Sequence, residues 1–500
     1  MERNTSSIQN NEETPLLTST LMSTTPKVYK RRWYILAVFS GLTLIQAGVW
    51  NSWGPIADTS SFVYGWKHSD IALLLNWGPI GFFIAAVPSF WLLDVAGLRW
   101  SAVLGSIFVC LGTGIRCLAL DLRPMQPWLI HVGQALNALA GPLLFAGPVV
   151  VSAVWFPIHE QTRAVAIGTT AGTVGMAMSF ILGPLLVRDI AVCNQTSIPK
   201  HQSLGAIYRD PQYDFIDNST SPVCPIVNRT DLTGARKDIQ KLMYIEWCYS
   251  GVLLLLALLY FPKQPPTPPS IAAGTQRTNF TQGLKAIVKN KKFWLIALPY
   301  GLPMGFYGVW SNFIDAILEP LNIQQEEAGW IGFWAIVGGS VTSLIVGSLL
   351  DYFKHRLKHV TVGIYIGALV STVWLILICR EVLPFSKVCL YIAAILSGGL
   401  VNTPPPLLYE LACQNSYPIG EGVTSGMMAI VYNIAAMTFL LIMMVPSMDT
   451  SWLNFGLLGC VCLAVPLLLI LRESFNRLDL DERAPGTPKS GKSGPLVPTV

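Results

Sequence analysis

The sequence predicts an all-α polytopic membrane protein in which twelve transmembrane helices form two halves of six. Three observations support this: a strongly apolar composition, twelve apolar runs long enough to cross a bilayer, and an internal repeat. Hydrophobic residues make up 52% of the 500 residues and charged residues only 12%, whereas soluble proteins carry about 25% charged residues. The composition excludes a soluble enzyme, a disordered scaffold and a nucleic-acid binder as the main body of the chain.

The apolar runs define the predicted helices and domains. A membrane-spanning helix needs about 20 mostly apolar residues, because no water is available in the bilayer to satisfy free backbone groups. The runs lie near residues 33–57, 70–93, 99–120, 128–153, 164–187, 242–262, 293–318, 328–350, 359–380, 386–411, 422–446 and 452–471. The predicted domains are a tail at 1–32, a half at 33–262, a linker at 263–292, a half at 293–471 and a tail at 472–500. Because residues 1–26 are polar, we expect the first helix to serve as the targeting signal.

Basic residues predict the orientation. With both termini in the cytoplasm, inner segments hold 21 of the 33 Lys and Arg residues and outer segments hold 12. Seven of those 12 lie in one long loop at 188–241, and the positive-inside rule discounts long loops. The short loops therefore favour cytoplasmic termini.

The long outer loop carries signs of a lumenal or extracellular location. Asn194, Asn218 and Asn228 each begin a glycosylation sequon, and Cys193 and Cys224 lie in the same segment. Sequons are modified, and disulfides form, on the non-cytoplasmic side of the membrane. We expect the three asparagines to be glycosylated and leave the pairing of the two cysteines open.

An internal repeat supports two parallel halves. Three short patterns of the first half return in the second half at offsets of 260, 257 and 261 residues. The pairs are Gly48–Ser52 with Gly308–Asn312, Leu92–Asp94 with Leu349–Asp351, and Phe156–Glu160 with Tyr417–Glu421. Six helices, a linker and six more helices are typical of transporters built from two repeats.

The segment Phe90–Arg99 resembles the loop between helices two and three of the major facilitator superfamily. In that superfamily an aspartate and a nearby arginine help to latch the two halves on the cytoplasmic side. The resemblance assigns this role to Asp94 and Arg99, and the repeat adds Asp351. The basic cluster of the family is thinned here, so Arg163 is an alternative partner. An ordinary turn between two helices is the competing interpretation.

Further strings are similar to solute carrier family 49 of that superfamily, over about residues 28–480. They are Val49–Ile56, Asp70–Phe82, Gly112–Cys117, Ala328–Trp334 and Arg472–Leu478. The resemblance implies an electrogenic lysosomal transporter that exports pyridoxine together with a proton. Other members of the family carry choline and ethanolamine.

The resemblance also implies a substrate site. Trp50, Tyr307 and Asn433 align with site positions of the choline-carrying relatives. Gln46 and Trp310 share helical faces with the two aromatic residues. Aromatic rings suit a protonated pyridine or a quaternary amine through stacking and cation–π attraction.

Backbone breaks are predicted beside this site. We expect the helices to break at Gly54-Pro55 and at Gly301-Leu302-Pro303. Such breaks would expose backbone groups to a cavity near the repeat interface.

Proton coupling requires an ionisable group within the membrane, where charge is costly. The candidates on the outer side are Asp315, Asp58, Glu246 and His131, and Arg116 is a potential partner for a carboxylate. Asp315 follows Tyr307 by eight residues, about two turns along one face of a helix. The competing interpretation of each group is a solvated side chain at the membrane surface.

The N-terminal tail carries a sorting pattern. Glu12, Leu16 and Leu17 fit an acidic dileucine signal, which adaptor proteins read on cytoplasmic tails as an address for lysosomes. A plain disordered tail is the competing interpretation.

The chemistry-bearing residues favour transport over catalysis. No metal cluster, nucleophile elbow or phosphate loop is evident, so we expect no enzyme activity, no metal, no cofactor and no nucleic-acid partner. Two alternatives to a proton-coupled pyridoxine exporter remain. One is a uniporter for choline or a related amine, and the other is a transporter-shaped receptor that moves nothing.

Overall fold

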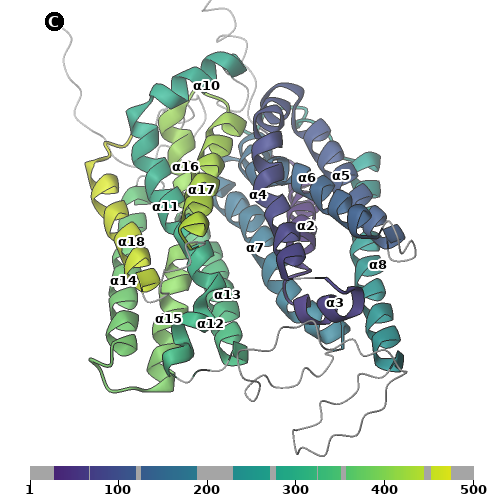
Figure 1. Ribbon diagram of the computed structural model, residues 1–500. Helices are drawn as coiled ribbons and strands as arrows, with labels where there is room; N and C mark the ends of the chain where they lie inside the picture. The colour runs from purple at the N-terminus through teal and green to yellow at the C-terminus, as the bar shows by residue number, and fades with distance from the viewer. Residues whose placement is uncertain are drawn as a thin grey trace, which may run out of the picture.

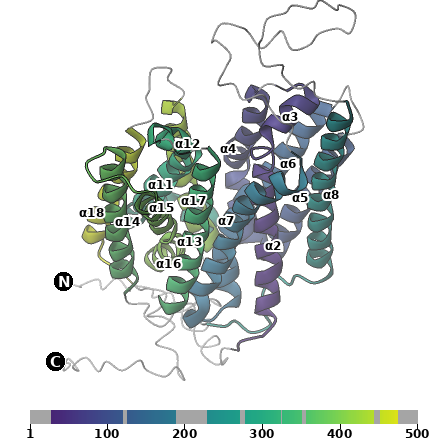
Figure 2. The same ribbon diagram turned by 90° about the horizontal axis from the view of Figure 1, so that it is seen from below.

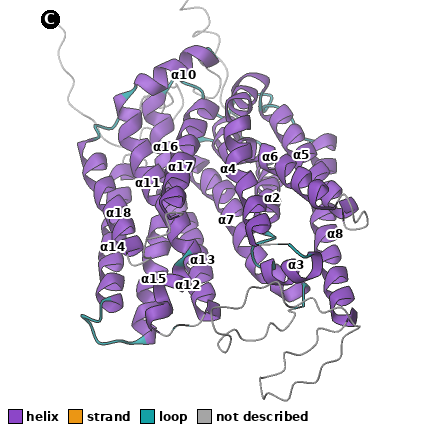
Figure 3. Cartoon of the chain, in the orientation of Figure 1, coloured by secondary structure: helices purple, strands orange, loops and turns teal. Residues whose placement is uncertain are grey.

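The computed structural model describes residues 27–66, 68–119, 126–188, 229–270, 278–321, 323, 325–350, 356–443 and 452–474. Within these ranges the regular structure is helical and contains no strand (Figure 3). The helices gather into two bundles, one from each half of the chain (Figures 1 and 2).

The N-terminal bundle follows the predicted order. Its long helices are α2 (Arg32–Asn51), α4 (His68–Trp91), α5 (Leu98–Ala119), α6 (Gln126–Trp155), α7 (Gln161–Leu186) and α8 (Arg229–Leu259). Three short elements join them, namely α3 (Ala57–Tyr64), the π-helical turn η1 (Leu92–Ala96) and the 3₁₀ turn η3 (Ile158–Glu160). The sixth helix begins at Arg229 rather than near residue 242. This extension is amphipathic and buries Ala235 and Ile239, so part of the predicted loop is helical.

The C-terminal bundle repeats this arrangement. Its helices are α11 (Lys291–Asn312), α13 (Gln325–Leu350), α14 (Leu357–Cys379), α15 (Lys387–Asn402), α16 (Pro405–Ser416), α17 (Glu421–Met443) and α18 (Leu453–Ile470). Short helices α10 (Phe280–Lys289) and α12 (Ile314–Leu318) flank α11, and the 3₁₀ turn η6 (Glu319–Leu321) follows. Prolines at 404–406 divide the tenth predicted helix into α15 and α16, because proline cannot continue a helical ladder.

The number of transmembrane helices agrees with the prediction. Among the described residues, eleven helices are long and apolar enough to cross a membrane, with α15 and α16 counted together as Lys387–Ser416. The remaining helix, α11, contains Pro299 and Pro303 and lies where the seventh helix is predicted, packed against α17 and α18. Eleven spans and α11 make twelve.

The two bundles touch over one part of their length. We call the end of the molecule that carries α10 and η1 the α10 side, and the opposite end, which carries α3 and α12, the α3 side (Figure 1). The main contacts between bundles join α7 to α13 and α16, and α17 to α4 and α6. At the middle of the molecule, the rings of Phe145 and Tyr432 stack with centroids 5.8 Å apart.

Closer to the α10 side, small residues let the bundles approach closely. A Cβ atom added to Gly426 would meet the ring of Phe90, and one added to Gly347 would meet Ala166. The hydroxyl of Ser425 donates to the carbonyl of Ala146 at 3.2 Å. Within the described residues, these contacts run from the α10 side to the middle of the molecule, so this side is closed.

Candidate functional site

The first helix stops at Asn51, as the Gly54-Pro55 pair predicts. Its last carbonyls bond to side chains rather than facing a cavity, because neighbouring helices supply donors. Arg116 donates to the carbonyl of Val49 at 3.3 Å, and Gln134 to that of Trp50 at 2.9 Å. Asn137 likewise donates to the carbonyl of Gln46 at 3.1 Å. The predicted break at Gly54-Pro55 is therefore present, but the backbone carbonyls before it are hydrogen-bonded to side chains and are not free to bind a substrate.

Sequence reasoning missed Gln134 and Asn137, although a signal for them was present. The two amides lie three residues apart in the mostly apolar helix α6, and residues at this spacing share a helical face. Both are completely buried, and their side-chain oxygens have no hydrogen-bond partner in the described part of the chain.

Trp50 is fixed against α4. Its indole N–H donates to the carbonyl of Leu75 at 2.8 Å, and a Cβ atom on Gly78 would collide with the indole ring. Gln46 lies one turn earlier and donates to the carbonyl of Asn137 at 3.4 Å. Trp50 and Gln46 are half-buried, whereas Trp53 is fully buried against the guanidinium of Arg116.

The predicted break at Gly301-Leu302-Pro303 is wrong, because α11 is continuous from Lys291 to Asn312. Pro303 has no N–H to donate to the carbonyl of Pro299. The hydroxyl of Tyr365, on α14, donates to that carbonyl at 2.7 Å. A side chain from another helix therefore replaces the missing helical hydrogen bond.

Tyr307 and Trp310 on α11 stack on each other, with centroids 5.7 Å apart, but their polar atoms differ. The indole of Trp310 donates to the side-chain oxygen of Asn454 on α18 at 2.7 Å. The hydroxyl of Tyr307 is buried and makes no well-aligned hydrogen bond in the described ranges. The side chain of Asn402 lies near enough for a weak polar contact with it. Trp310 thus belongs to the packing of the bundle, and Tyr307 keeps an unused polar atom.

Replacing Trp310 with Phe should lower the free energy of unfolding by about 1–3 kcal/mol, because the buried amide of Asn454 loses its donor. Thermal unfolding of the detergent-purified protein measures the change. The matched control is Trp100→Phe, since Trp100 is 63% exposed. Equal stability of the two variants would contradict this assignment.

Asn433 lies on α17, and its side chain donates to the carbonyl of Ala429 in the preceding turn at 2.8 Å. It is half-buried and follows Tyr432, whose ring stacks on Phe145 of the other bundle. The structure thus places Asn433 beside the central contact between the bundles.

A charged pair is buried in the N-terminal bundle. A guanidinium nitrogen of Arg116 lies 3.3 Å from a carboxylate oxygen of Glu246, and their side chains are 0% and 10% exposed. Arg116 also donates to the hydroxyl of Ser52 at 2.8 Å. The pair ties α5 and α8 to the end of α2.

Asp94 in η1 joins the two bundles. Its carboxylate accepts the backbone N–H groups of Gly422 and Val423, both at 2.8 Å, at the start of α17. Cβ atoms on Gly420 or Gly422 would collide with this carboxylate. A helix N-terminus has free N–H groups and a positive dipole end, so it favours an anion. Arg99 is exposed.

Comparison with known proteins decides the family. The model of the Major Facilitator Superfamily matches residues 21–191 and 242–440. The solute carrier family 49 member 4 homolog of Xenopus tropicalis is 35% identical over 464 residues, 91% of this chain and 94% of the relative. The chain belongs to solute carrier family 49 of the Major Facilitator Superfamily.

This family 49 transporter is also similar to a curated relative and to a solved structure. The mouse choline/ethanolamine transporter FLVCR1 is 28% identical over 82% of this chain and 69% of its own length. The crystal structure of the transporter FucP in its outward conformation has a TM-score of 0.61 at 14% identity, over 88% of this chain and 99% of that chain. The similarity to FucP concerns the fold alone.

Two proton-coupling candidates of the family 49 transporter lie on short helices of the α3 side. Asp58 falls in α3 and Asp315 in α12, and both side chains lie outside the described residues. The expected two turns along one face from Tyr307 to Asp315 are wrong, because α11 ends at Asn312 and a new helix begins at Ile314.

Other predicted residues of the family 49 transporter also lie outside the described residues. They are Asp351, the sequon residues Asn194, Asn218 and Asn228, and the dileucine residues Glu12, Leu16 and Leu17. Within the described ranges, His, Cys, Asp and Glu side chains form no group that would hold a metal.

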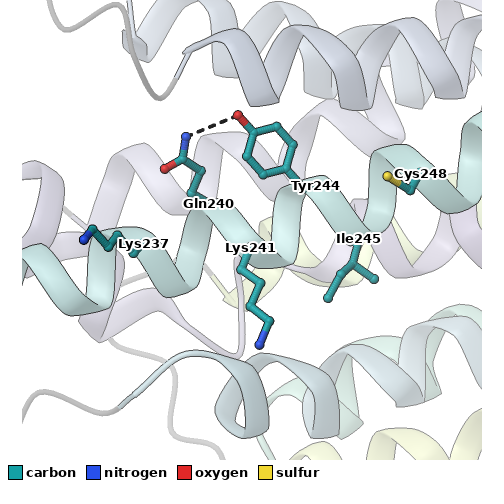
Figure 4. Close-up of a pocket in the computed structure, with 6 residues that line it drawn as sticks. All are labelled: Lys237, Gln240, Lys241, Tyr244, Ile245 and Cys248. Carbon is teal, nitrogen blue, oxygen red and sulfur yellow. Dashed lines mark hydrogen bonds between the residues drawn. The ribbon is translucent and has the colours of Figure 1, made fainter.

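Two hollows on the described surface are lined by none of Gln46, Trp50, Tyr307 and Asn433. One shallow hollow follows α8 and is lined by Lys237, Gln240, Lys241, Tyr244, Ile245 and Cys248 (Figure 4). Another lies at the start of α15, beside Lys387 and Tyr391. Both hollows are lined by lysine and tyrosine, which are typical of the interface between membrane and water. We therefore interpret them as interfacial surface and not as part of a substrate site.

Proposed function

We propose that this family 49 transporter exports pyridoxine from the lysosomal lumen together with a proton. The proposal rests on its likeness along almost the whole chain to family 49 member 4 homologs. The exposed Lys and Arg residues favour the α10 side as cytoplasmic. The α3 side then faces the lumen, and the contacts between the bundles close the cytoplasmic side.

Trp50, Gln46, Tyr307 and Asn433 form the proposed substrate site. The indole ring of Trp50 is held in place by its hydrogen bond to α4. The hydroxyl of Tyr307 is buried and makes no well-aligned hydrogen bond in the described ranges. A protonated pyridine ring with hydroxyl groups suits both, through stacking and a hydrogen bond. Trp310, whose indole is already bonded to Asn454, is not part of this proposed site.

Further proposals concern location and modification. The dileucine signal at Glu12, Leu16 and Leu17 recruits adaptor proteins in the cytoplasm, and Asn194, Asn218 and Asn228 carry glycans in the lumen. Asp94 acts as the latch on the cytoplasmic side.

Uptake of radiolabelled pyridoxine tests the function. Leu16→Ala with Leu17→Ala should move the protein to the plasma membrane, so that lumenal export becomes uptake from the medium. We expect saturable uptake that is larger at pH 5.5 than at pH 7.5.

Choline is the parallel substrate, since the relative FLVCR1 is a choline/ethanolamine transporter. Uptake of choline alone, independent of pH, would favour an amine uniporter. Uptake of neither substrate, with surface expression confirmed, would favour a receptor that transports nothing.

Tyr307→Phe should raise the KM for pyridoxine roughly three- to tenfold, the equivalent of one neutral hydrogen bond. The free energy of unfolding should fall by no more than about 1 kcal/mol, because the hydroxyl makes no well-aligned hydrogen bond in the described ranges and has only the side chain of Asn402 within reach. Uptake kinetics and thermal unfolding of the same variant separate the two effects. An unchanged KM would remove Tyr307 from the site.

A further inference from the structure

A histidine and a tryptophan join α4 to α6 on the α3 side. The indole N–H of Trp77 donates to Nδ1 of His131 at 3.1 Å. Both residues are half-buried, and the imidazole lies in the second turn of α6, at the end of that helix on the α3 side.

This hydrogen bond exists in only one protonation state of His131. An indole N–H donates and never accepts, so the nitrogen that faces it must carry a free lone pair. The imidazole is then neutral, with its proton on Nε2. Binding a second proton converts Nδ1 into a donor, and two donors face each other. Histidine is the side chain that most readily changes charge between pH 5 and pH 8, so uptake of a proton from an acidic lumen would break the bond.

The charged groups closest to the imidazole belong to α4, α5 and α8. Asp70 of α4 lies about two turns before Trp77 and acts on His131 electrostatically. From α5, Arg116 packs against Gly133 of α6, but it is paired with Glu246 of α8. The charged residues of the other neighbours of α6 lie at their α10 ends. These are Arg32 on α2, Arg163 on α7 and Glu421 on α17.

The same turn of α4 holds the proposed substrate residue Trp50. Leu75, whose carbonyl accepts the indole of Trp50, lies two residues before Trp77. Gly78, against which the ring of Trp50 packs, follows Trp77 directly. Any displacement of this turn therefore moves the surface on which Trp50 rests.

We propose that His131 is the proton-binding residue of the transporter, and that its protonation releases Trp77 and frees the turn of α4 that holds Trp50. This inference rests on the proposed function, since it assumes an acidic compartment on the α3 side. The proton and the substrate are then assigned to residues of the same helical turn, namely Trp77 for the proton and Leu75 and Gly78 for the substrate.

Hydrogen–deuterium exchange of the purified, substrate-free protein tests the proposal. After correction for intrinsic rates, the peptide covering residues 68–80 should exchange roughly two- to tenfold faster at pH 5.5 than at pH 7.5, the equivalent of one hydrogen bond. His131→Gln keeps an acceptor at every pH and should abolish the difference. Trp77→Phe should exchange fast at both pH values.

Trp128→Phe is the matched control, because Trp128 lies one turn from His131 on α6 and is 76% exposed. It should behave as wild type. The same acid-dependent exchange in His131→Gln as in wild type would overturn the proposal.

Uptake separates this proposal from the proposed function. His131→Gln, in the surface-directed protein, should transport at one rate at both pH values. Acid-stimulated uptake that persists in His131→Gln would overturn the proposal. The expected exchange pattern without any pyridoxine uptake by the wild type would support the proton site and reject pyridoxine as the substrate.

Discussion

Replacing Glu246 with Ala is expected to lower the free energy of unfolding by about 3–5 kcal/mol. The variant leaves the guanidinium of Arg116, which is completely buried, without its counter-charge. Losing one partner of a buried ion pair costs this much because the remaining charge stays desolvated. Arg116 also bonds to the end of α2, so we expect the damage to spread to that helix.

Thermal unfolding of the purified protein, together with its surface expression, measures this effect. The matched control is Asp238→Ala, two turns earlier on α8, where the pair with Arg188 is 22% and 54% exposed. A solvent-exposed pair contributes at most about 1 kcal/mol. If Glu246→Ala lowered the free energy of unfolding as little as Asp238→Ala does, Arg116 and Glu246 would not form a buried ion pair.

Replacing Asp94 with Ala should open the α10 side of the transporter. The variant removes two charge-assisted hydrogen bonds to the start of α17 and the anion that the helix dipole favours. We expect a shift of about 2–3 kcal/mol, or roughly 30- to 150-fold, towards the state open on that side.

Labelling of a cysteine placed at Ser425 reports this opening, since Ser425 is buried at the contact between the bundles. In a background without other reactive cysteines, Asp94→Ala should react faster with a maleimide added from the α10 side. Arg99→Ala should react like the parent, because Arg99 is exposed. Equal labelling of Asp94→Ala and its parent would remove Asp94 as the latch.

The number and order of the helices follow from composition, because every span must bury its backbone polar groups within itself. The sequence did not predict which proline breaks a helix. Gly54-Pro55 ends α2, whereas Pro303 does not interrupt α11, because Tyr365 donates to the carbonyl that Pro303 leaves free. Tyr365 lies about sixty residues further along the chain, so no local pattern reveals this bond.

The internal repeat predicts where equivalent residues lie in the chain but not what they touch. Trp50 and Trp310 hold equivalent places in the repeat. Trp50 bonds to the backbone of α4 and Trp310 to Asn454 of α18. For Asp94, the glycine pattern of Gly420, just before α17, and Gly422 and Gly426, within it, was a usable signal, since each glycine makes room for a residue of the other bundle.

The closed stretch between the bundles has an electrical consequence. It extends along α17 from Val423 to Tyr432, nine residues, or about 14 Å of helix. A hydrocarbon core is about 30 Å thick, and voltage drops chiefly across the part that ions in solution do not enter. If solution reaches the middle of the molecule from the α3 side, the field is concentrated on this half. Membrane potential then acts mainly on the step that opens the closed stretch, and only weakly on the arrival of a transported molecule from the α3 side.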